Sequence, residues 1–90
     1  MPKPKPPTLT ALASISVGST IIVTGAGFDA GELVLLGDSH TGQYVNADDG
    51  GGFTHDMGYT YSGPGNAGVE AFVQRRHDWV WVASVKFTVG

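Results

Sequence analysis

Three histidines, each within two residues of an aspartate, are the first side chains whose types could hold a metal ion. The pairs are Asp38 with His40, His55 with Asp56, and His77 with Asp78. None of them has the i, i+4 spacing of a ligand pair on a helix, and adjacent residues of a strand face opposite sides. A shared ion would therefore require three loops to converge. We interpret these side chains as turn residues that bind nearby backbone amides, and predict no metal site.

Two glycine-rich segments match ligand-binding patterns only in part. The acidic run Asp48–Gly52 lacks the third alternating oxygen ligand and the terminal glutamate of a calcium loop, so it predicts a hairpin turn. The run Gly25–Ala30 satisfies the G-x-G-x-x-A pattern of a dinucleotide site, which requires a helix to follow. Only the six residues Gly31–Leu36 follow before Gly37 and Asp38 end the regular segment, and six residues are too few for that helix. We therefore predict a turn there and no cofactor.

Catalytic groups occur together only in Asp38-Ser39-His40. Adjacency is the wrong arrangement for a hydrolase, because the members of a catalytic triad come together from separate elements. No two acidic residues are placed to face one another across a sugar, as a glycosidase requires. A chain of this length also has little room for a deep cleft. We assign no catalytic residue and predict that the protein is not an enzyme.

Trp79 and Trp81 are two residues apart and therefore share one face of a strand. Exposed, they would form a platform for stacking a sugar ring; buried, they would be core residues of a small β-fold. They are in register with Ala83, Val85 and Phe87, which favours burial, with Trp79 nearer the rim. Carbohydrate binding through Trp79 and Trp81 is retained as the alternative function.

The composition restricts the classes of protein further. The chain has 90 residues, 14 glycines and no cysteine, which allows one domain and excludes disulfides, thiolate zinc sites and cysteine nucleophiles. Its net charge of −3 argues against a general nucleic-acid binder. No apolar run approaches the ~18 residues of a membrane helix. We expect neither nucleic acid nor membrane as a partner.

Short runs of β-branched and aromatic residues recur every 8 to 12 residues or so, separated by glycine-rich breaks, as in an antiparallel sandwich. No stretch has the 3.6-residue apolar period of a helix. The sequence predicts an all-β, two-sheet sandwich of about seven strands with no helix. The expected strands are Thr8–Ser14, Thr20–Thr24, Glu32–Leu36, Gln43–Ala47, Phe53–Tyr61, Val69–Arg75 and Trp79–Val89.

Alternation within these strands separates a core face from an outward face. The predicted core face contains Ile21, Val23, Val34, Leu36, Val69, Ala71, Val73, Trp79, Trp81, Ala83, Val85, Phe87 and Val89. The predicted outward face contains Leu33, Leu35, Phe72, Val80 and Val82. The outward set is too apolar for water, so we expect another chain to cover it.

Residues 1–7, MPKPKPP, form a separate amino-terminal segment before the domain at 8–90. The prolines favour an extended arm, from which Lys3 and Lys5 can reach acidic groups. Between Pro6 and Gln74 there is no lysine or arginine, whereas seven of the eight acidic residues lie there. The arm is therefore basic and the body acidic, which suits docking on a larger acidic assembly.

The segment from Gly18 to Val34, with its V-x-G-x-G-F core at Val23–Phe28, resembles bacterial and phage immunoglobulin-like domains. Two later stretches extend the resemblance, the turn Ala47–Phe53 and the closing strand Ala83–Val89, so that it covers about residues 8 to 89. It implies an immunoglobulin-like Greek key, with Phe28 closing one end of the sandwich. Such domains serve in several kinds of protein, so the fold alone does not define the function.

A single such domain with a short basic arm resembles the decoration proteins of tailed-phage capsids. The resemblance implies a structural virion protein that is made in the host cytoplasm and cements or decorates the capsid surface. Its partner would be the major capsid protein or another virion lattice, with a homo-oligomer also open. The expected partner-binding residues are Lys3, Lys5, Leu33, Leu35, Phe72, Val80 and Val82. The alternative is a carbohydrate- or cell-surface-binding module, in which Trp79 and Trp81 bind a glycan.

Overall fold

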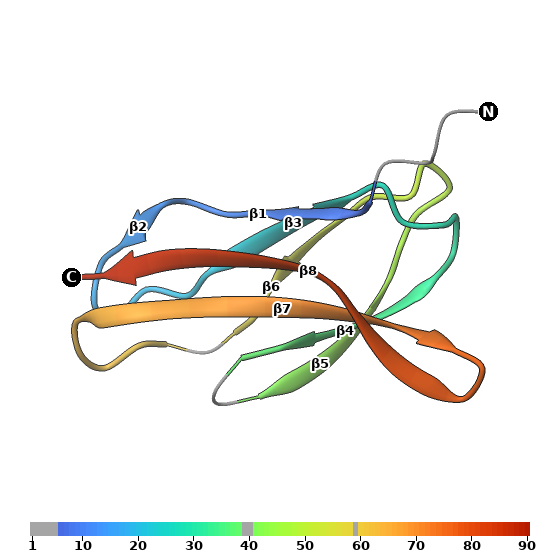
Figure 1. Ribbon diagram of the computed structural model, residues 1–90. Coiled ribbons are helices and arrows are strands. Elements are labelled where there is room, and N and C mark those ends of the chain that lie inside the picture. Colours follow the sequence, from blue (N-terminus) through green and yellow to red (C-terminus); the bar gives the residue numbers. More distant parts are fainter. Residues whose placement is uncertain (1–5, 39–40, 59) are drawn as a thin grey trace.

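The computed structural model describes residues 6–38, 41–58 and 60–90, and these fold into two β-sheets that face each other (Figure 1). The described residues form no helix, and hence none that could span a membrane. The predicted all-β architecture with two sheets is confirmed, and it is consistent with a β-sandwich. The strands are β1 (Thr8–Thr10), β2 (Ser14–Ile15), β3 (Ile22–Ala26), β4 (Leu33–Gly37), β5 (Gly42–Asn46), β6 (Phe53–Asp56), β7 (Gly65–Arg75) and β8 (Asp78–Val89).

The small sheet has the order β1-β3-β6 and the large sheet the order β2-β8-β7-β4-β5. All neighbouring strands are antiparallel except β2 and β8, which run parallel. The single strand predicted over Thr8–Ser14 is wrong, because the chain leaves the small sheet after β1 and joins β8 of the large sheet as β2. The described residues therefore contain eight strands, where the sequence predicts about seven.

Two other strand boundaries differ from the prediction by more than two residues. The strand predicted over Phe53–Tyr61 ends at Asp56, whose carboxylate accepts the Gly58 N–H at 2.8 Å and turns the chain away from the sheet. The strand predicted from Val69 begins at Gly65, because pairing with the end of β8 extends β7 toward its amino end. The β7–β8 hairpin is consequently the longest element of the fold.

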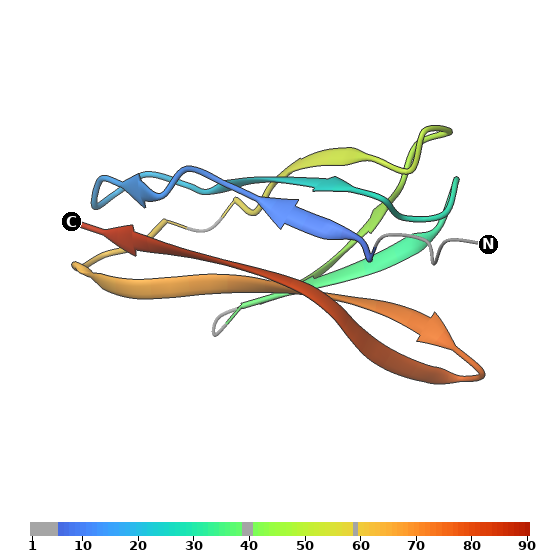
Figure 2. The same cartoon turned by 45° about the horizontal axis from the view of Figure 1, so that its top comes forward.

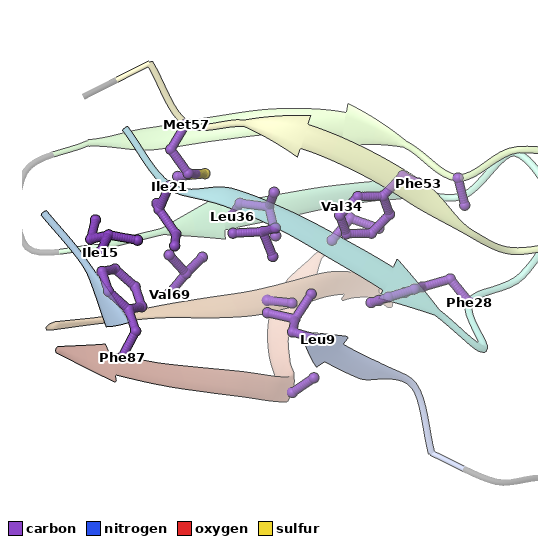
Figure 3. Packing of buried hydrophobic residues seen from close by; sticks show 14 of the residues in the cluster. Leu9, Ile15, Ile21, Phe28, Val34, Leu36, Phe53, Met57, Val69 and Phe87 are labelled. Carbon is purple, nitrogen blue, oxygen red and sulfur yellow. The ribbon is translucent and has the colours of Figure 1, made fainter. Parts of the chain in front are cut away.

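The core fills the space between the two sheets (Figure 3). Val23, Val34 and Leu36 are fully buried at positions that alternate with exposed or half-buried neighbours, as the sequence predicts for strands with one buried face. Phe28 is buried at one end of the core, with its ring centroid 5.4 Å from that of Phe53. Gly25 lies under the Phe53 ring, where any side chain would overlap the ring.

A β-bulge at Val82 reverses the side-chain alternation of β8, so that Trp79 and Trp81 lie on the opposite face from the one predicted. Ala71 pairs with Ala83 and Phe72 pairs with Trp81, so Val82 is an extra residue without a partner on β7. Directly opposite residues share a face, and Phe72 points away from the core. The predicted burial of Trp79 and Trp81 is therefore wrong: they are 37% and 54% exposed.

The predicted outward positions of Val80 and Val82 are also wrong, because of the same bulge. Val80 lies opposite the buried Val73, so it faces the core side of the sheet, and half-buried Val82 packs against the core. Val80 nevertheless remains 43% exposed. The end of the hairpin diverges from the small sheet, which leaves that side uncovered (Figure 2).

The β7–β8 hairpin closes through Arg76 and His77, whose φ angles are +50° and +78°. A two-residue turn with both φ angles positive follows the twist of the strands, but it favours asparagine and glycine.

We expect His77→Gly to raise the free energy of unfolding by about 0.5 to 1 kcal/mol. Glycine adopts a positive φ without the steric cost of a side chain, and its larger conformational entropy in the unfolded chain offsets part of that gain. Urea denaturation measures the change. Asp49→Gly, at an exposed turn residue without positive φ, is the control and should give no gain; an equal gain there would refute the explanation.

Candidate binding surface

One row of apolar side chains crosses four strands on the outer face of the large sheet. Leu35 on β4 pairs with Tyr44 on β5 and with Phe72 on β7, and Phe72 pairs with Trp81 on β8. Tyr44 is 60% exposed and Trp81 is 54% exposed, whereas Leu35 and Phe72 between them are half-buried. The row therefore has a covered aliphatic and aromatic centre with an exposed aromatic ring at each end.

Two further apolar residues extend this row toward the end of the hairpin. Leu33 on β4 is 40% exposed, and the Trp79 ring lies 5.8 Å from the Tyr44 ring, tilted by 46°. Offset and tilted ring pairs of this kind add stabilisation beyond the area they bury, so they hold the exposed rings in place. We name as the aromatic face the six residues Leu33, Leu35, Tyr44, Phe72, Trp79 and Trp81.

The outer surface of the β7–β8 hairpin becomes polar on the side of this row away from the turn. The paired residues there are Glu70 with Ser84, Gly68 with Lys86, and Asn66 with Thr88, which together form what we name the polar strip. A hollow of about 520 Å³ lies over the strip, and Phe72 of the aromatic face forms part of its wall. The surface is therefore raised at the large side chains of the aromatic face and lower over the polar strip, where Gly68 has no side chain.

Arg75 ties the end of β7 to the loop before β4. Its Nη1 donates to Glu32 Oε2 at 2.7 Å, and its Nη2 lies 3.9 Å from Asp29 Oδ2. The hydrogen bond to Glu32 raises the pKa of the Arg75 guanidinium, with smaller contributions from the charges of Glu32 and Asp29. This contact links the hairpin, which carries Trp79 and Trp81, to the strand that carries Leu33.

No family model, curated protein or solved structure matches the chain.

The partner-binding residues expected from the sequence divide into three groups in the structure. Leu33, Leu35 and Phe72 lie together on the aromatic face. Val80 and Val82 do not join them, because the bulge turns both to the other side of the sheet. Lys3 and Lys5 lie outside the described residues. Tyr44 was missed by the sequence analysis, although its position in an alternating run places it outward on a strand.

The acidic turn at Asp48–Gly52 uses its own first carboxylate. Asp48 Oδ1 accepts the N–H groups of Gly50 and Gly52, each at 2.9 Å, while the Asp48 N–H donates to the Gly52 carbonyl at 2.8 Å. A turn stands here in place of a calcium loop, but it connects β5 of the large sheet to β6 of the small sheet, so the predicted hairpin turn is wrong. The run Gly25–Ala30 likewise leads through a loop directly into β4, where a dinucleotide site requires a helix.

Of the three histidine–aspartate pairs, Asp38, His55 and Asp56 bind nearby groups, and no such contact is found for His77 or Asp78 within the described residues. His55 Nε2 lies 2.6 Å from Gln43 Oε1, and the Gln43 amide donates to the Met57 carbonyl, which joins β5 to the end of β6. Asp38 accepts the Thr41 N–H at 2.8 Å and the Tyr61 hydroxyl at 3.3 Å. Ser39 and His40 lie outside the described residues. Within residues 6–38, 41–58 and 60–90, no three His, Asp or Glu side chains form a group that could hold a metal ion.

Removing divalent ions should leave the stability of the protein unchanged. Asp48 Oδ1 accepts two backbone amides, and within the described part of the chain no three acidic or histidine side chains come together, so a calcium ion would find too few ligands there. We expect the same melting temperature in a chelator, in calcium and in zinc. A rise in melting temperature with either ion would show a site on the native state and contradict this assignment.

Proposed function

We propose that this chain is a non-enzymatic structural protein that docks on a protein lattice through its aromatic face. The lattice we propose is the shell of a phage capsid, assembled from the major capsid protein. The chain would be made in the host cytoplasm and located on the capsid surface, where it cements or decorates the shell.

The finer fold proposed here is an immunoglobulin-like Greek key. In an immunoglobulin sandwich the first, second and fifth strands share one sheet, and the third, sixth and seventh share the other. With β1 and β2 taken as one divided strand and β5 as an addition, β1, β3 and β6 lie in one sheet and β4, β7 and β8 in the other. This partition supports the resemblance seen in the motifs at Gly18–Val34 and Ala83–Val89.

The observation that carries the function is the apolar row from Tyr44 to Trp81 across four strands. Isolated exposed apolar residues are normal on a protein surface, but a contiguous apolar patch marks an interaction site. Tryptophan and tyrosine dominate the energetics of such sites because each buries a large, rigid surface at low conformational cost. The aromatic face supplies both residue types around an aliphatic centre.

The distribution of charge supports an acidic lattice as the partner. The described body carries all eight acidic residues, whereas Lys3 and Lys5 in the arm provide basic charge at the amino end. We propose that the arm adds a salt-dependent attraction to the contact made by the aromatic face.

A second candidate function is carbohydrate binding, and the exposure of Trp79 and Trp81 favours it. The sequence analysis keeps this function as the alternative and ranks it second, because it places both rings in the core. With both rings at the surface, they can stack on the apolar face of a sugar.

Co-sedimentation tests the proposed function against the second candidate. The chain is mixed with capsid shells from the phage whose genome encodes it and, separately, with immobilised polysaccharide. Saturable pelleting with shells is the expected result. Retention on polysaccharide without pelleting would replace lattice docking by the second candidate.

A further inference from the structure

The hollow over the polar strip lies beside the aromatic face, and Phe72 is the one residue of that face that lines it. Its lining includes the carboxylate of Glu70, the hydroxyl of Ser84 and the ammonium of Lys86. Gly37 and Gly68 add no side chain to its floor, which lets a ligand approach the sheet backbone. Its volume of about 520 Å³ is within the range of small-molecule sites.

Four polar side chains line the hollow, and one of them, Asp38, already accepts the Thr41 N–H and the Tyr61 hydroxyl. The other three can bind a ligand. Glu70, Ser84 and Lys86 are exposed, and none of their side chains forms a hydrogen bond or ion pair within the described part of the chain. The ion pairs found there both belong to Arg75. The strip therefore presents a hydrogen-bond acceptor, a hydroxyl and a donor in adjacent rows, with none of them committed to the fold.

A second hollow continues the first along the hairpin. It has a volume of about 600 Å³, shares Gly68 and Lys86 with the first, and reaches Asn66 and Thr88. The two hollows together follow the paired strands β7 and β8 from the chain end toward Phe72. A ligand that filled both would be extended, and one of its ends would lie against the aromatic face.

We propose that the polar strip binds an extended polysaccharide of neutral or N-acetylated hexose units. One ring would stack on Trp81 and Phe72, and the following rings would lie in the two hollows. Hydroxyl groups would donate to Glu70 and accept from Lys86, while Ser84 can do either. This inference rests on the second candidate function and gives it a ligand class and a location.

Sugar chains fit this surface better than a peptide strand does. A peptide that added to a sheet would need the free edge of a strand, whereas the strip lies on the face of two strands that already pair with each other. A pyranose ring has an apolar face for the aromatic wall and a rim of hydroxyl groups for the polar side chains. Equatorially linked hexoses also form the straight chain that the two hollows require.

Titration of the full chain with cellohexaose and with chitohexaose tests the proposal. Tryptophan fluorescence reports stacking on Trp81, and amide chemical shifts report contact along the strip. We expect saturable binding of at least one hexasaccharide, weakened about tenfold by Glu70→Ala and about fivefold by Ser84→Ala. Thr24→Ala, at an exposed position of the small sheet, is the control and should leave the affinity unchanged.

The results separate this inference from lattice docking. Glu70→Ala leaves the aromatic face intact, so pelleting with capsid shells should persist in that variant. Absence of saturable binding for both hexasaccharides at millimolar concentration would overturn the inference. Binding that Trp81→Ala weakens but Glu70→Ala and Ser84→Ala do not would also overturn it, because the strip would then make no contact.

Discussion

Trp81→Ala should weaken binding to capsid shells by about 30-fold or more, equivalent to ~2 kcal/mol. The Trp81 ring ends the apolar row and is 54% exposed, so a partner can bury it without disturbing the core. Truncation removes the largest surface that the aromatic face offers while leaving the pairing of β7 with β8 in place. A binding isotherm from co-sedimentation measures the change, and urea denaturation verifies that the variant is folded.

Val80→Ala is the matched control, because Val80 is the neighbouring residue on β8 and is 43% exposed. It faces the other side of the sheet, so its truncation should change shell binding less than twofold, a threshold of about 0.4 kcal/mol. Ile22→Ala on the outer surface of the small sheet provides a second control. If Val80→Ala or Ile22→Ala weakened binding as much as Trp81→Ala, the docking surface would lie elsewhere.

Gly51→Ala should destabilise the fold by about 3 kcal/mol or more. Gly51 has φ of +80°, and a Cβ at this position would overlap the backbone carbonyl of Phe28. Phe28 N–H donates to the Gly51 carbonyl at 3.0 Å, so the two segments cannot separate without breaking that hydrogen bond. The loss is a large fraction of the stability of a small domain, and urea denaturation measures it.

Gly58→Ala separates the two causes of this loss. Gly58 has φ of +70° but open space around the position of a Cβ, so alanine there should cost only the left-handed conformation, about 1 to 2 kcal/mol. Equal losses in the two variants would mean that the contact between Gly51 and Phe28 contributes nothing.

The alternation of apolar residues was sufficient to predict the core wherever one face of a strand is polar. Val23 has Thr24 beside it, and Val69 has Glu70 beside it, so only one of the two faces of each strand can be buried. The outward position of Phe72, on the face that also carries Glu70 and Gln74, follows from this pattern. Leu33 and Leu35 were placed outward by the same alternation, although both faces of their strand are apolar.

The start of β8 could not be predicted in the same way, because both of its faces are apolar. In Trp79-Val80-Trp81-Val82 either alternation gives a plausible core, so the pattern does not locate the bulge. Val82 becomes the extra residue through its pairing with β7, which is a tertiary property. The aromatic face depends on that bulge, since it is what turns Trp79 and Trp81 outward.

Tyr44 shows a second limit of the sequence analysis. Its strand was predicted, but the placement of β5 beside β4 follows from the order of strands in the large sheet. Only that order brings Tyr44 opposite Leu35 and its ring next to Trp79. The aromatic face combines residues of β4, β5, β7 and β8, so it can be recognised only once the order of these strands in the sheet is known.

Cryo-electron microscopy of capsid shells carrying the bound protein tests the docking of the aromatic face most directly. The account predicts density in which the outer face of the large sheet lies against the shell, with Phe72 and Trp81 in contact with it. The outer face of the small sheet, including Ile22 and Thr24, should point to solvent. Density with the small sheet against the shell, or with Trp81 facing solvent, would contradict the account.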